Sequence, residues 1–310
     1  MVDERVHPEL RRVARLVPSL SIKPWSVGLV RRLGGLPIKG ATPGVEVHDT
    51  LATMGSGGSV PVRVYLPAER SGPLATLLWI HGGGLIMGSH INDPLGAKFA
   101  GELGIAVVSA AYRLAPEHPY PAALDDLIAV AEWIRADPAA LGLDPLRVAV
   151  GGGSAGGGLA AALTQRLHDA ATPAAAQLLV YPMLDDRTAV RDDIGPKQHL
   201  LWNKTSDFTG WQAYLGTEPG SPLVPGGAVP ARRTDLSGLA PAWIGVGTLD
   251  LFHDECLAYA DRLREAGVDC QLEVVEGAIH GFDELARTTD IARRFLDAQS
   301  EFLRSVLLPG

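Results

Sequence analysis

The stretch Leu146–Gly158 reads LRVAVGGGSAGGG, and three interpretations of it are possible. An apolar run leads into six glycines that surround a single serine, Ser154, and a helical pattern follows. Residues 151–156 match G-x-G-x-x-G, which cradles the pyrophosphate of a dinucleotide, whereas residues 152–156 match G-x-S-x-G, which exposes a nucleophilic serine on a sharp turn. A flexible connection between a strand and a helix is a third interpretation. The rest of the chain has to discriminate among the three.

Short apolar runs before and after this stretch have the composition of strands that are buried on both faces of a parallel sheet. These runs are ATLLWI, IAVVSA, RVAV, QLLVYP, AWIGVG and CQLEVV. Helical patterns separate or follow them, at 93–103, 122–136, 154–169, 254–266 and 288–306. Upstream, VEVHDTLAT and VPVRVYL alternate apolar and polar residues on either side of MGSGG, which is typical of a hairpin. The pattern predicts a doubly wound α/β sheet of eight strands, the first two antiparallel.

Two segments interrupt this alternation. Residues 1–43 read as short helices. About 60 residues separate QLLVYP from AWIGVG, and they include the helical pattern HLLWNKTSDFTGWQAYLG. A structureless loop of that length is uncommon in a compact domain. We therefore predict that residues 44–186 and 239–310 form the α/β domain, and that 1–43 and 187–238 form a helical cap.

The composition argues against several classes of protein. The chain has 310 residues, with 27 Lys+Arg against 35 Asp+Glu and a net charge of −8. A nucleic-acid-binding surface needs a basic footprint, which we do not find, so we expect no nucleic-acid partner. The first twenty residues carry charge throughout and do not resemble a secretory signal. The longest charge-free run, 71–92, contains Pro73 and five glycines, so it predicts a buried strand and a loop rather than a membrane span.

The two cysteines, Cys256 and Cys270, give neither a disulfide framework nor a metal-binding spacing. We expect two reduced thiols in a cytoplasmic protein, with the question of their pairing left open. No HEXXH motif or paired Cys/His spacing occurs, so we expect no metal. A homodimer is a candidate assembly, and the sequence leaves the oligomeric state undecided.

The other sequence features that accompany a dinucleotide-binding glycine motif are missing here. Such a site has an acidic residue about 20 residues beyond the fingerprint, at the end of the next strand. Here the position twenty residues past Gly156 is Ala176, and the first acid after the next strand is Asp185. Four predicted strands precede the fingerprint, and it has no P-loop lysine. We therefore expect no nucleotide and no other cofactor.

The nucleophile interpretation makes demands that the sequence meets. The residues two positions either side of the serine must be very small, and they are Gly152 and Gly156. A base and an orienting acid must follow, in the order serine, acid, histidine. Asp250, in GTLDLFHDE, comes after the strand AWIGVG, and His280, in EGAIHGFDE, comes after the last strand. These loops lie at one edge of a parallel sheet, where the sites of α/β proteins are built.

Other residues compete for each of these roles. Ser154 could simply cap the helix that follows it. Asp254 and Glu255 rival Asp250, but they fall within the next helix, where acids are common in the first turn. His253 is too close to the acid to lie on a separate loop, and His168 falls late in the helix after the serine. The glycine loop WIHGGGLIMGS, after the third strand, is suited to supply backbone N–H donors to an oxyanion.

With these residues in place, the sequence resembles the hormone-sensitive-lipase group of α/β-hydrolases, the bacterial family IV esterases, over nearly the whole chain. The matching motifs are HGGG at His81–Gly84, YRLAPEHPYPAALDD at Tyr112–Asp126, GSAGGG at Gly153–Gly158, D-x-x-x-D-E at Asp250–Glu255 and HGF at His280–Phe282. Any one of these motifs is weak, but their order and spacing together are highly specific. The resemblance implies an α/β-hydrolase fold.

The resemblance also implies roles for individual residues. Ser154 would be the nucleophile, Asp250 the acid and His280 the base, while Gly82, Gly83 and Ala155 would donate backbone N–H groups to the oxyanion. Residues expected to bind substrate are Leu85, Trp202, Trp211 and Phe282. The family usually has Asp or Thr before the serine, whereas this chain has Gly153. That departure puts the rigidity of the turn and the substrate preference in question.

These assignments predict a serine carboxylesterase for short- to medium-chain esters, which works through an acyl-enzyme and needs no cofactor. Its partner would be a small ester, and a cap over the site would limit the acyl chain to fewer than about ten carbons. An amidase or lactonase on the same three residues is the alternative. A non-catalytic binder of small molecules on a hydrolase scaffold, like the plant gibberellin receptors, is a further one, although such proteins lack the histidine.

Overall fold

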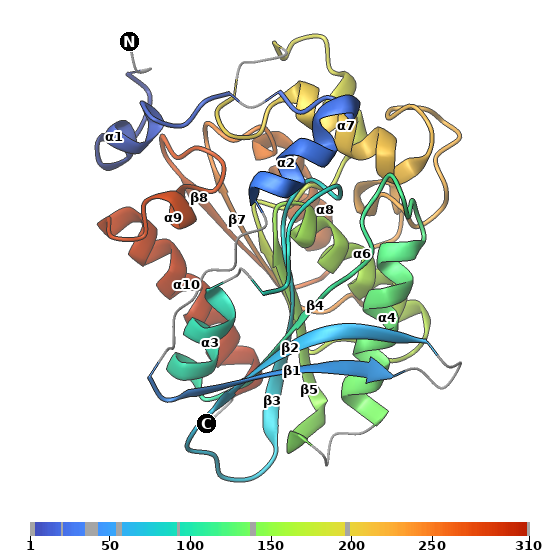
Figure 1. Cartoon of the computed structure of the whole chain (residues 1–310), viewed down its shortest axis with the longest axis vertical. Coiled ribbons are helices and arrows are strands. Elements are labelled where there is room, and N and C mark those ends of the chain that lie inside the picture. The colour runs from blue at the N-terminus through green and yellow to red at the C-terminus, as the bar shows by residue number, and fades with distance from the viewer. Residues whose placement is uncertain are drawn as a thin grey trace.

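The computed structural model describes residues 4–19, 21–34, 43–53, 58–91, 94–136, 141–195 and 199–308. A sheet of eight strands runs through its centre in the order β1-β2-β4-β3-β5-β6-β7-β8 (Figure 1). The strands are β1 (Val45–Thr53), β2 (Ser59–Pro67), β3 (Leu74–Ile80), β4 (Ala106–Ala110), β5 (Leu143–Gly153), β6 (Gln177–Val180), β7 (Ala242–Gly247) and β8 (Cys270–Val275). Strand β2 is antiparallel to both of its neighbours, and all other pairs are parallel. The predicted eight-stranded, mostly parallel sheet is confirmed.

The central strands are apolar because helices cover both faces of the sheet. Every residue of β3, β4, β6 and β7 is buried. In Figure 1, α3 and α10 lie on one side of the sheet, and α4, α6 and α8 lie on the other. The bounds are α3 (Leu95–Leu103), α4 (Ala122–Ala136), α6 (Ala155–Asp169), α8 (His253–Glu265), α9 (Phe282–Leu285) and α10 (Asp290–Leu307).

Strand β1 forms one edge of the sheet and pairs along its whole length with β2. The hairpin predicted from the alternating pattern is therefore present, although residues 54–57 of the expected turn lie outside the described residues. Val47 and Leu51 are about half exposed, at 45% and 51%. The alternation in this strand predicts pairing but not burial, because an edge strand is incompletely covered.

Residues 21–34 and the segment between β6 and β7 lie together above the carboxyl ends of the strands, whereas residues 8–14 lie apart from that segment, near α9 (Figure 1). Their elements are η1 (Pro8–Leu10), α1 (Arg11–Ala14), η2 (Pro24–Ser26), α2 (Val27–Gly34), η3 (Asp186–Val190), α7 (Lys204–Leu215) and η4 (Pro230–Arg232). Asn203 donates from Nδ2 to Ser19 Oγ at 2.9 Å, and Ile22 N donates to Ser206 Oγ at 2.8 Å. Hydrogen bonds thus join segments that are about 180 residues apart.

The helix expected over 199–216 begins only at Lys204. Asn203 has extended backbone and its side chain accepts a hydrogen bond from Ser206 N, which is the arrangement of an N-cap. The periodicity extends the helix too far because the preceding residues, His199 to Trp202, lie in irregular structure that enters the core. No described helix is both long enough and apolar enough to cross a membrane.

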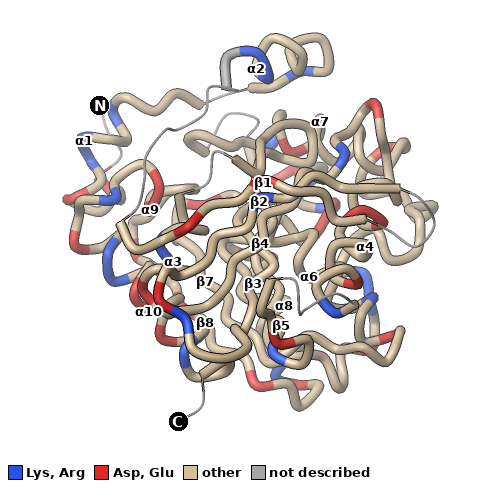
Figure 2. Tube along the Cα trace, turned by 60° about the horizontal axis from the view of Figure 1, so that its bottom comes forward, with Lys and Arg blue, Asp and Glu red and all other residues tan. Residues whose placement is uncertain are grey.

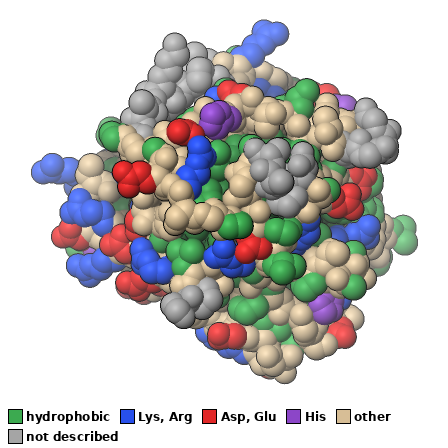
Figure 3. Space-filling view, turned by 90° about the horizontal axis from the view of Figure 1, so that it is seen from below, with side chains coloured by type: hydrophobic (Ala, Val, Ile, Leu, Met, Phe, Trp, Pro, Cys, Tyr) green, Lys and Arg blue, Asp and Glu red, His purple; other side chains and the backbone are tan. Residues whose placement is uncertain are grey.

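Charges of both signs are dispersed over the molecule. Figure 2 shows Lys and Arg interspersed with Asp and Glu along the trace, and the face in Figure 3 carries acidic, basic and apolar side chains in mixture. Neither sign gathers into one continuous patch on that face. Cys256 and Cys270 are both free and buried, so in this structure they do not pair.

Candidate active site

The turn between β5 and α6 holds Ser154 in a conformation that few side chains adopt. Its φ is 57° and its ψ is −123°, which is strained for a non-glycine residue. A Cβ on Gly152 would lie 2.5 Å from the carbonyl oxygen of Ile80, and one on Gly156 would lie 2.0 Å from the same oxygen. The glycines of G-x-S-x-G are therefore required by the close approach of this turn to the end of β3.

Ser154, His280 and Asp250 form a hydrogen-bonded series at the carboxyl edge of the sheet. His280 Nε2 lies 2.9 Å from Ser154 Oγ, and His280 Nδ1 lies 2.7 Å from Asp250 Oδ2. A carboxylate only accepts hydrogen bonds, so Nδ1 carries the proton and Nε2 is left to accept from the serine hydroxyl. Phe252 N donates to the other carboxylate oxygen of Asp250 at 2.9 Å. All three side chains are buried.

The competing residues lie elsewhere. Asp254 is exposed on α8 and pairs with Arg191 and with His253. Glu255 is buried, and it accepts hydrogen bonds from Leu184 N and from the hydroxyl of Thr188. His168 lies near the end of α6. Of the candidates from the sequence, the structure brings Ser154, Asp250 and His280 together and leaves their rivals in other contacts.

The glycine loop after β3 lies beside the serine. A Cβ on Gly82 would be 3.4 Å from Ser154 Cβ, which is van der Waals contact. The carbonyl oxygen of Gly83 accepts from Ile86 N and Met87 N, and a φ of 119° at Gly83 turns the loop. Ala155 is the first residue of α6, so its N–H has no acceptor within the helix. The three expected oxyanion donors thus flank the serine.

His81, the first residue of this loop, makes two contacts that hold the loop in place. Its Nδ1 lies 2.8 Å from the carbonyl oxygen of Gly82, and its ring stacks on Tyr112 with the centroids 4.3 Å apart. Burial lowers the pKa of His81 to about 4, so the ring is neutral and Nδ1–H donates to that carbonyl. These contacts describe a residue that shapes the glycine loop.

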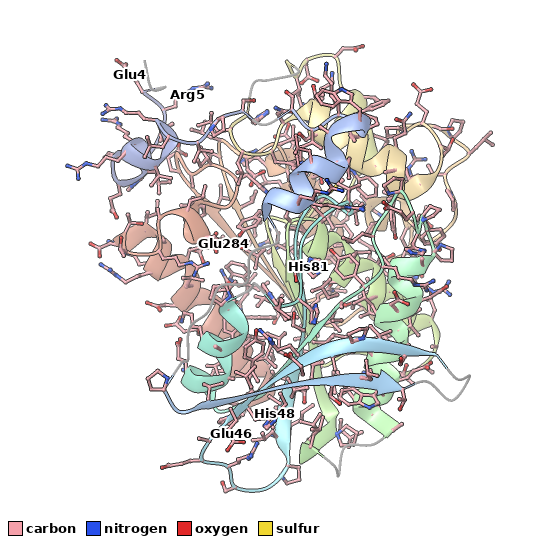
Figure 4. All side chains as sticks on the ribbon, viewed as in Figure 1. Glu4, Arg5, Glu46, His48, His81 and Glu284 are labelled. Atoms are coloured by element: carbon pink, nitrogen blue, oxygen red, sulfur yellow. The ribbon has the colours of Figure 1, made fainter. Side chains whose placement is uncertain are left out.

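A pocket of about 290 Å³ opens in front of Ser154. Its side-chain walls include Trp79, Met87, Tyr181, Leu201, Trp202 and Leu285. Figure 4 labels two more lining residues, His81 from the loop after β3 and Glu284 from α9. Most of the wall is apolar, as in small-molecule sites generally.

Trp202 is the one of the four expected substrate-binding residues that lines this pocket. Leu85, Trp211 and Phe282 are buried and are not among the described residues that line it, so we do not include them in the proposed binding site. Each of these three side chains packs into the core instead. An apolar side chain next to a motif is as useful to the core as to a pocket, and sequence alone does not separate the two.

Sequence reasoning missed Tyr181, Trp79 and Leu201. Tyr181 directly follows β6, and its ring meets the edge of His280 with centroids 4.8 Å apart. The rule that found Asp250, a polar residue at the carboxyl end of a parallel strand, could have found it. Leu201 carried no signal, because it reaches the pocket through irregular backbone with a φ of 60°.

The described residues contain no group of three or more His, Cys, Asp or Glu side chains that could hold a metal ion. The fold and this site together define the class of α/β hydrolases. A family model described as α/β hydrolase fold matches residues 77–284, and the chain belongs to this family.

Relatives of known name cover most of the chain. The esterase LipI of Mycobacterium tuberculosis is 33% identical, over 98% of this chain and 97% of its own. The ethyl acetate hydrolase of Pseudomonas putida is 35% identical, over 76% of this chain and 75% of its own. Among solved structures, a bacterial heroin esterase is 34% identical, superposes with a TM-score of 0.90 and covers 98% of both chains.

Proposed function

We propose that this chain is a serine carboxylesterase, in which Ser154 forms the acyl-enzyme with short- to medium-chain carboxylic esters. The observation that carries the proposal is the series from Ser154 Oγ through His280 to Asp250, with bonds of 2.9 and 2.7 Å at the mouth of a pocket. Relatives that are named as esterases and span nearly the whole chain support an ester as the substrate.

In the first half-reaction, Ser154 Oγ attacks the ester carbonyl carbon while its proton moves to His280 Nε2. Asp250 holds Nδ1–H, which fixes the tautomer and stabilises the imidazolium. The tetrahedral intermediate then collapses, the bond to the alcohol oxygen breaks, and His280 returns the proton to the departing alcohol. Water repeats the sequence on the acyl-enzyme, releases the carboxylic acid and restores the serine.

The negative charge of the tetrahedral intermediate falls on the former carbonyl oxygen. Backbone N–H groups of Gly82, Gly83 and Ala155 would receive it. Each such donor typically contributes about 3 kcal/mol of transition-state stabilisation. Ala155 is also the first residue of α6, so the positive end of the helix dipole faces the same oxygen.

The cap assignment also remains our proposal. Residues 1–43 and 187–238 would roof the site, and the hydrogen bonds from Asn203 to Ser19 and from Ile22 to Ser206 support a single joint roof. Ile22 and Trp202 come from the two segments, and both line the pocket. A cytoplasmic location and a homodimer stay predictions from the sequence.

A substrate panel tests this function. Purified protein is assayed on p-nitrophenyl acetate and butyrate, the matching anilides and a set of lactones. We expect the highest kcat/KM on the esters, labelling of Ser154 by a fluorophosphonate, and loss of both in Ser154→Ala. A preference for anilides or lactones would move the chain to the alternative acyl hydrolases, and unchanged labelling of Ser154→Ala would refute the nucleophile.

A further inference from the structure

The glycine loop beside Ser154 is packed from above by the segment between β6 and β7. A Cβ on Gly84 would lie 1.9 Å from Cη2 of Trp202, so the indole ring rests directly on the backbone of Gly84. Gly210 of α7 approaches the same residue, since a Cβ there would lie 2.5 Å from the carbonyl oxygen of Gly84. The position of Trp202 therefore affects the loop that carries Gly82 and Gly83.

A buried carboxyl group orients this tryptophan. Trp202 Nε1 donates to Asp207 Oδ1 at 3.3 Å, and Asp207 is 0% exposed. Asp207 lies in the first turn of α7, where its N–H donates to the carbonyl oxygen of the N-cap residue, Asn203. Its second oxygen, Oδ2, has no hydrogen-bond partner among the described residues. Burying a carboxyl group that has a single side-chain hydrogen-bond donor lowers the stability of the fold, so a buried acid at this position suggests a functional role.

Asp207 is surrounded by other acids. Asp185 and Asp186 at η3, Asp250 after β7 and Glu255 on α8 all interact with it electrostatically. Burial first, and then the nearby charges of Asp186, Asp185 and Asp250, raise the pKa of Asp207 well above its usual range, while the bond from Trp202 opposes the rise. The raised pKa favours the protonated carboxyl group, whose oxygen Oδ1 accepts the indole N–H as an amide oxygen would.

We propose that Asp207 is a positioning residue for ester hydrolysis, which acts by holding the Trp202 indole against Gly84 and thereby the glycine loop against Ser154. This inference rests on the proposed function and names the residue that sets the geometry of its oxyanion donors. Asp207 itself touches no reacting atom in this account. It acts through Trp202, whose ring both walls the pocket and packs on the loop.

The arrangement predicts which kinetic constant changes. Removing the acceptor leaves the indole N–H buried without a partner, and the ring shifts to find one. Gly84 then loses its packing, and the donors of the loop move away from the position of the oxyanion. Because the oxyanion exists only in the transition state, kcat falls more than KM rises.

Three single variants, one double variant and a matched control test the proposal on kcat and KM for p-nitrophenyl acetate. We expect Asp207→Leu and Trp202→Phe each to lower kcat about tenfold with KM within about twofold. Asp207→Asn keeps an oxygen acceptor and should stay within about twofold of wild type. The double variant Asp207→Leu/Trp202→Phe should be no worse than either single one, because both polar partners are gone.

The control is Trp211→Phe. Trp211 is a buried tryptophan on α7, and its Nε1 has no hydrogen-bond partner among the described residues. The same chemical change should leave kcat within about twofold. An equal loss in Trp211→Phe, or losses that add fully in the double variant, would overturn the proposal.

A transition-state analogue separates positioning from folding. A trifluoromethyl ketone forms a hemiketal on the serine, and its affinity should fall in parallel with kcat in Asp207→Leu. A lower melting temperature with unchanged kcat and unchanged ketone affinity would reduce Asp207 to a structural role and refute the inference.

If the wild type hydrolyses no ester, the proposed function fails by itself. The rate of fluorophosphonate labelling of Ser154 then tests the positioning role of Asp207, because labelling needs the serine and the glycine loop but no ester turnover. Slower labelling in Asp207→Leu and normal labelling in Asp207→Asn would support the positioning role. Equal labelling rates would overturn it.

Discussion

Gly156, in the first turn of α6, lies so close to Ile80, at the end of β3, that a Cβ on it would stand 2.0 Å from the Ile80 carbonyl oxygen. Backbone atoms occupy that space, so a side chain could be accommodated only by moving the helix away from the strand. We expect Gly156→Ala to lower the free energy of unfolding by about 1–3 kcal/mol or more, measured by urea denaturation.

The control for that change is Gly153→Ala. A Cβ at Gly153 would meet the ring of Tyr181 at 3.5 Å, which is an ordinary contact. We expect its unfolding free energy to stay within about 0.5 kcal/mol of wild type. The backbone therefore does not require glycine at position 153. Equal losses of unfolding free energy in Gly153→Ala and Gly156→Ala would contradict this explanation.

Asp250 and Asp254 are close in sequence but differ in environment. Asp250 is buried against His280, whereas Asp254 is exposed and pairs with Arg191. Asp250→Asn should lower kcat on the order of 10⁴-fold, because an amide fails to hold the imidazole in the required tautomer. Asp254→Asn should change kcat less than about threefold. The reverse order, measured with p-nitrophenyl acetate, would transfer the acid role to Asp254.

Asp207 should make stability depend on pH in a defined direction. Its pKa is raised in the folded state, so the unfolded chain releases the proton first, and stability is lost as pH rises above the ordinary pKa near 4 towards the folded value. Asp207→Asn removes this titration. We therefore expect urea unfolding to show that the free energy of unfolding of Asp207→Asn, relative to that of wild type, is higher at pH 8 than at pH 4.

Asp254→Asn supplies a control of opposite sign. His253 and Arg191 lower the pKa of Asp254, so its stabilising contribution is present above the ordinary pKa and is lost on acidification. The free energy of unfolding of Asp254→Asn should therefore be lower than that of wild type at pH 8. The difference should be small because the ion pair is near the surface. Parallel behaviour of the two variants would be inconsistent with the assigned charge states.

The pocket should limit the length of the acyl chain. At about 290 Å³, with Trp79, Leu201 and Trp202 among its walls, it has room for a small ester. Each added methylene should help by up to about 0.8 kcal/mol while it fits, and kcat/KM should fall beyond that length. Across p-nitrophenyl esters of two to sixteen carbons, we expect the maximum below about ten. A maximum at fourteen or sixteen would mean that the roof opens.

Arg31 on α2 fastens the N-terminal segment to the site. It donates to the carbonyl oxygens of Ile86 and Ala115 and to the Glu117 carboxylate, and it holds the pKa of Glu117 below its usual range. Arg31→Ala should lower kcat/KM by about three- to tenfold, because Ile86 belongs to the loop that begins with the glycines. The exposed neighbour Arg32 is the control, and an equal effect of Arg32→Ala would count against this role.

Strands β3, β4, β6 and β7 were predictable because they are buried on both faces and form uninterrupted apolar runs. The run CQLEVV also forms a strand, β8, but the expectation that it is buried on both faces was wrong, because β8 lies at the edge of the sheet and is largely exposed or half-buried. The start of α7 was not predictable, since the periodicity of HLLWNKTSDFTGWQAYLG does not reveal that Asn203 caps the helix and that Trp202 lies before it. Asp207 shows the same limit: an acid in the first turn of a helix is usually solvated, and only the tertiary fold buries it.

The roles proposed for Ser154, Asp250 and His280 could be read from the sequence because each follows a strand at the same sheet edge. The pocket walls depend instead on which apolar side chains happen to face inward. Leu85 and Phe282 pack into the core, whereas Leu201 and Tyr181 face the cavity. Such choices follow from packing between segments distant in sequence, which local pattern does not encode.

The hydrogen bond from Asn203 to Ser19 spans 184 residues and bears on how the chain emerges from the ribosome. At about 5–20 residues per second, synthesis of that interval takes roughly 10–40 s. Throughout this time the partners of Ser19 and Ile22, which are Asn203 and Ser206, have not yet been synthesised. Strands β1 to β6 precede α7 in the chain, whereas β7 and β8 follow it, so six strands are synthesised before the proposed roof of the pocket can be completed.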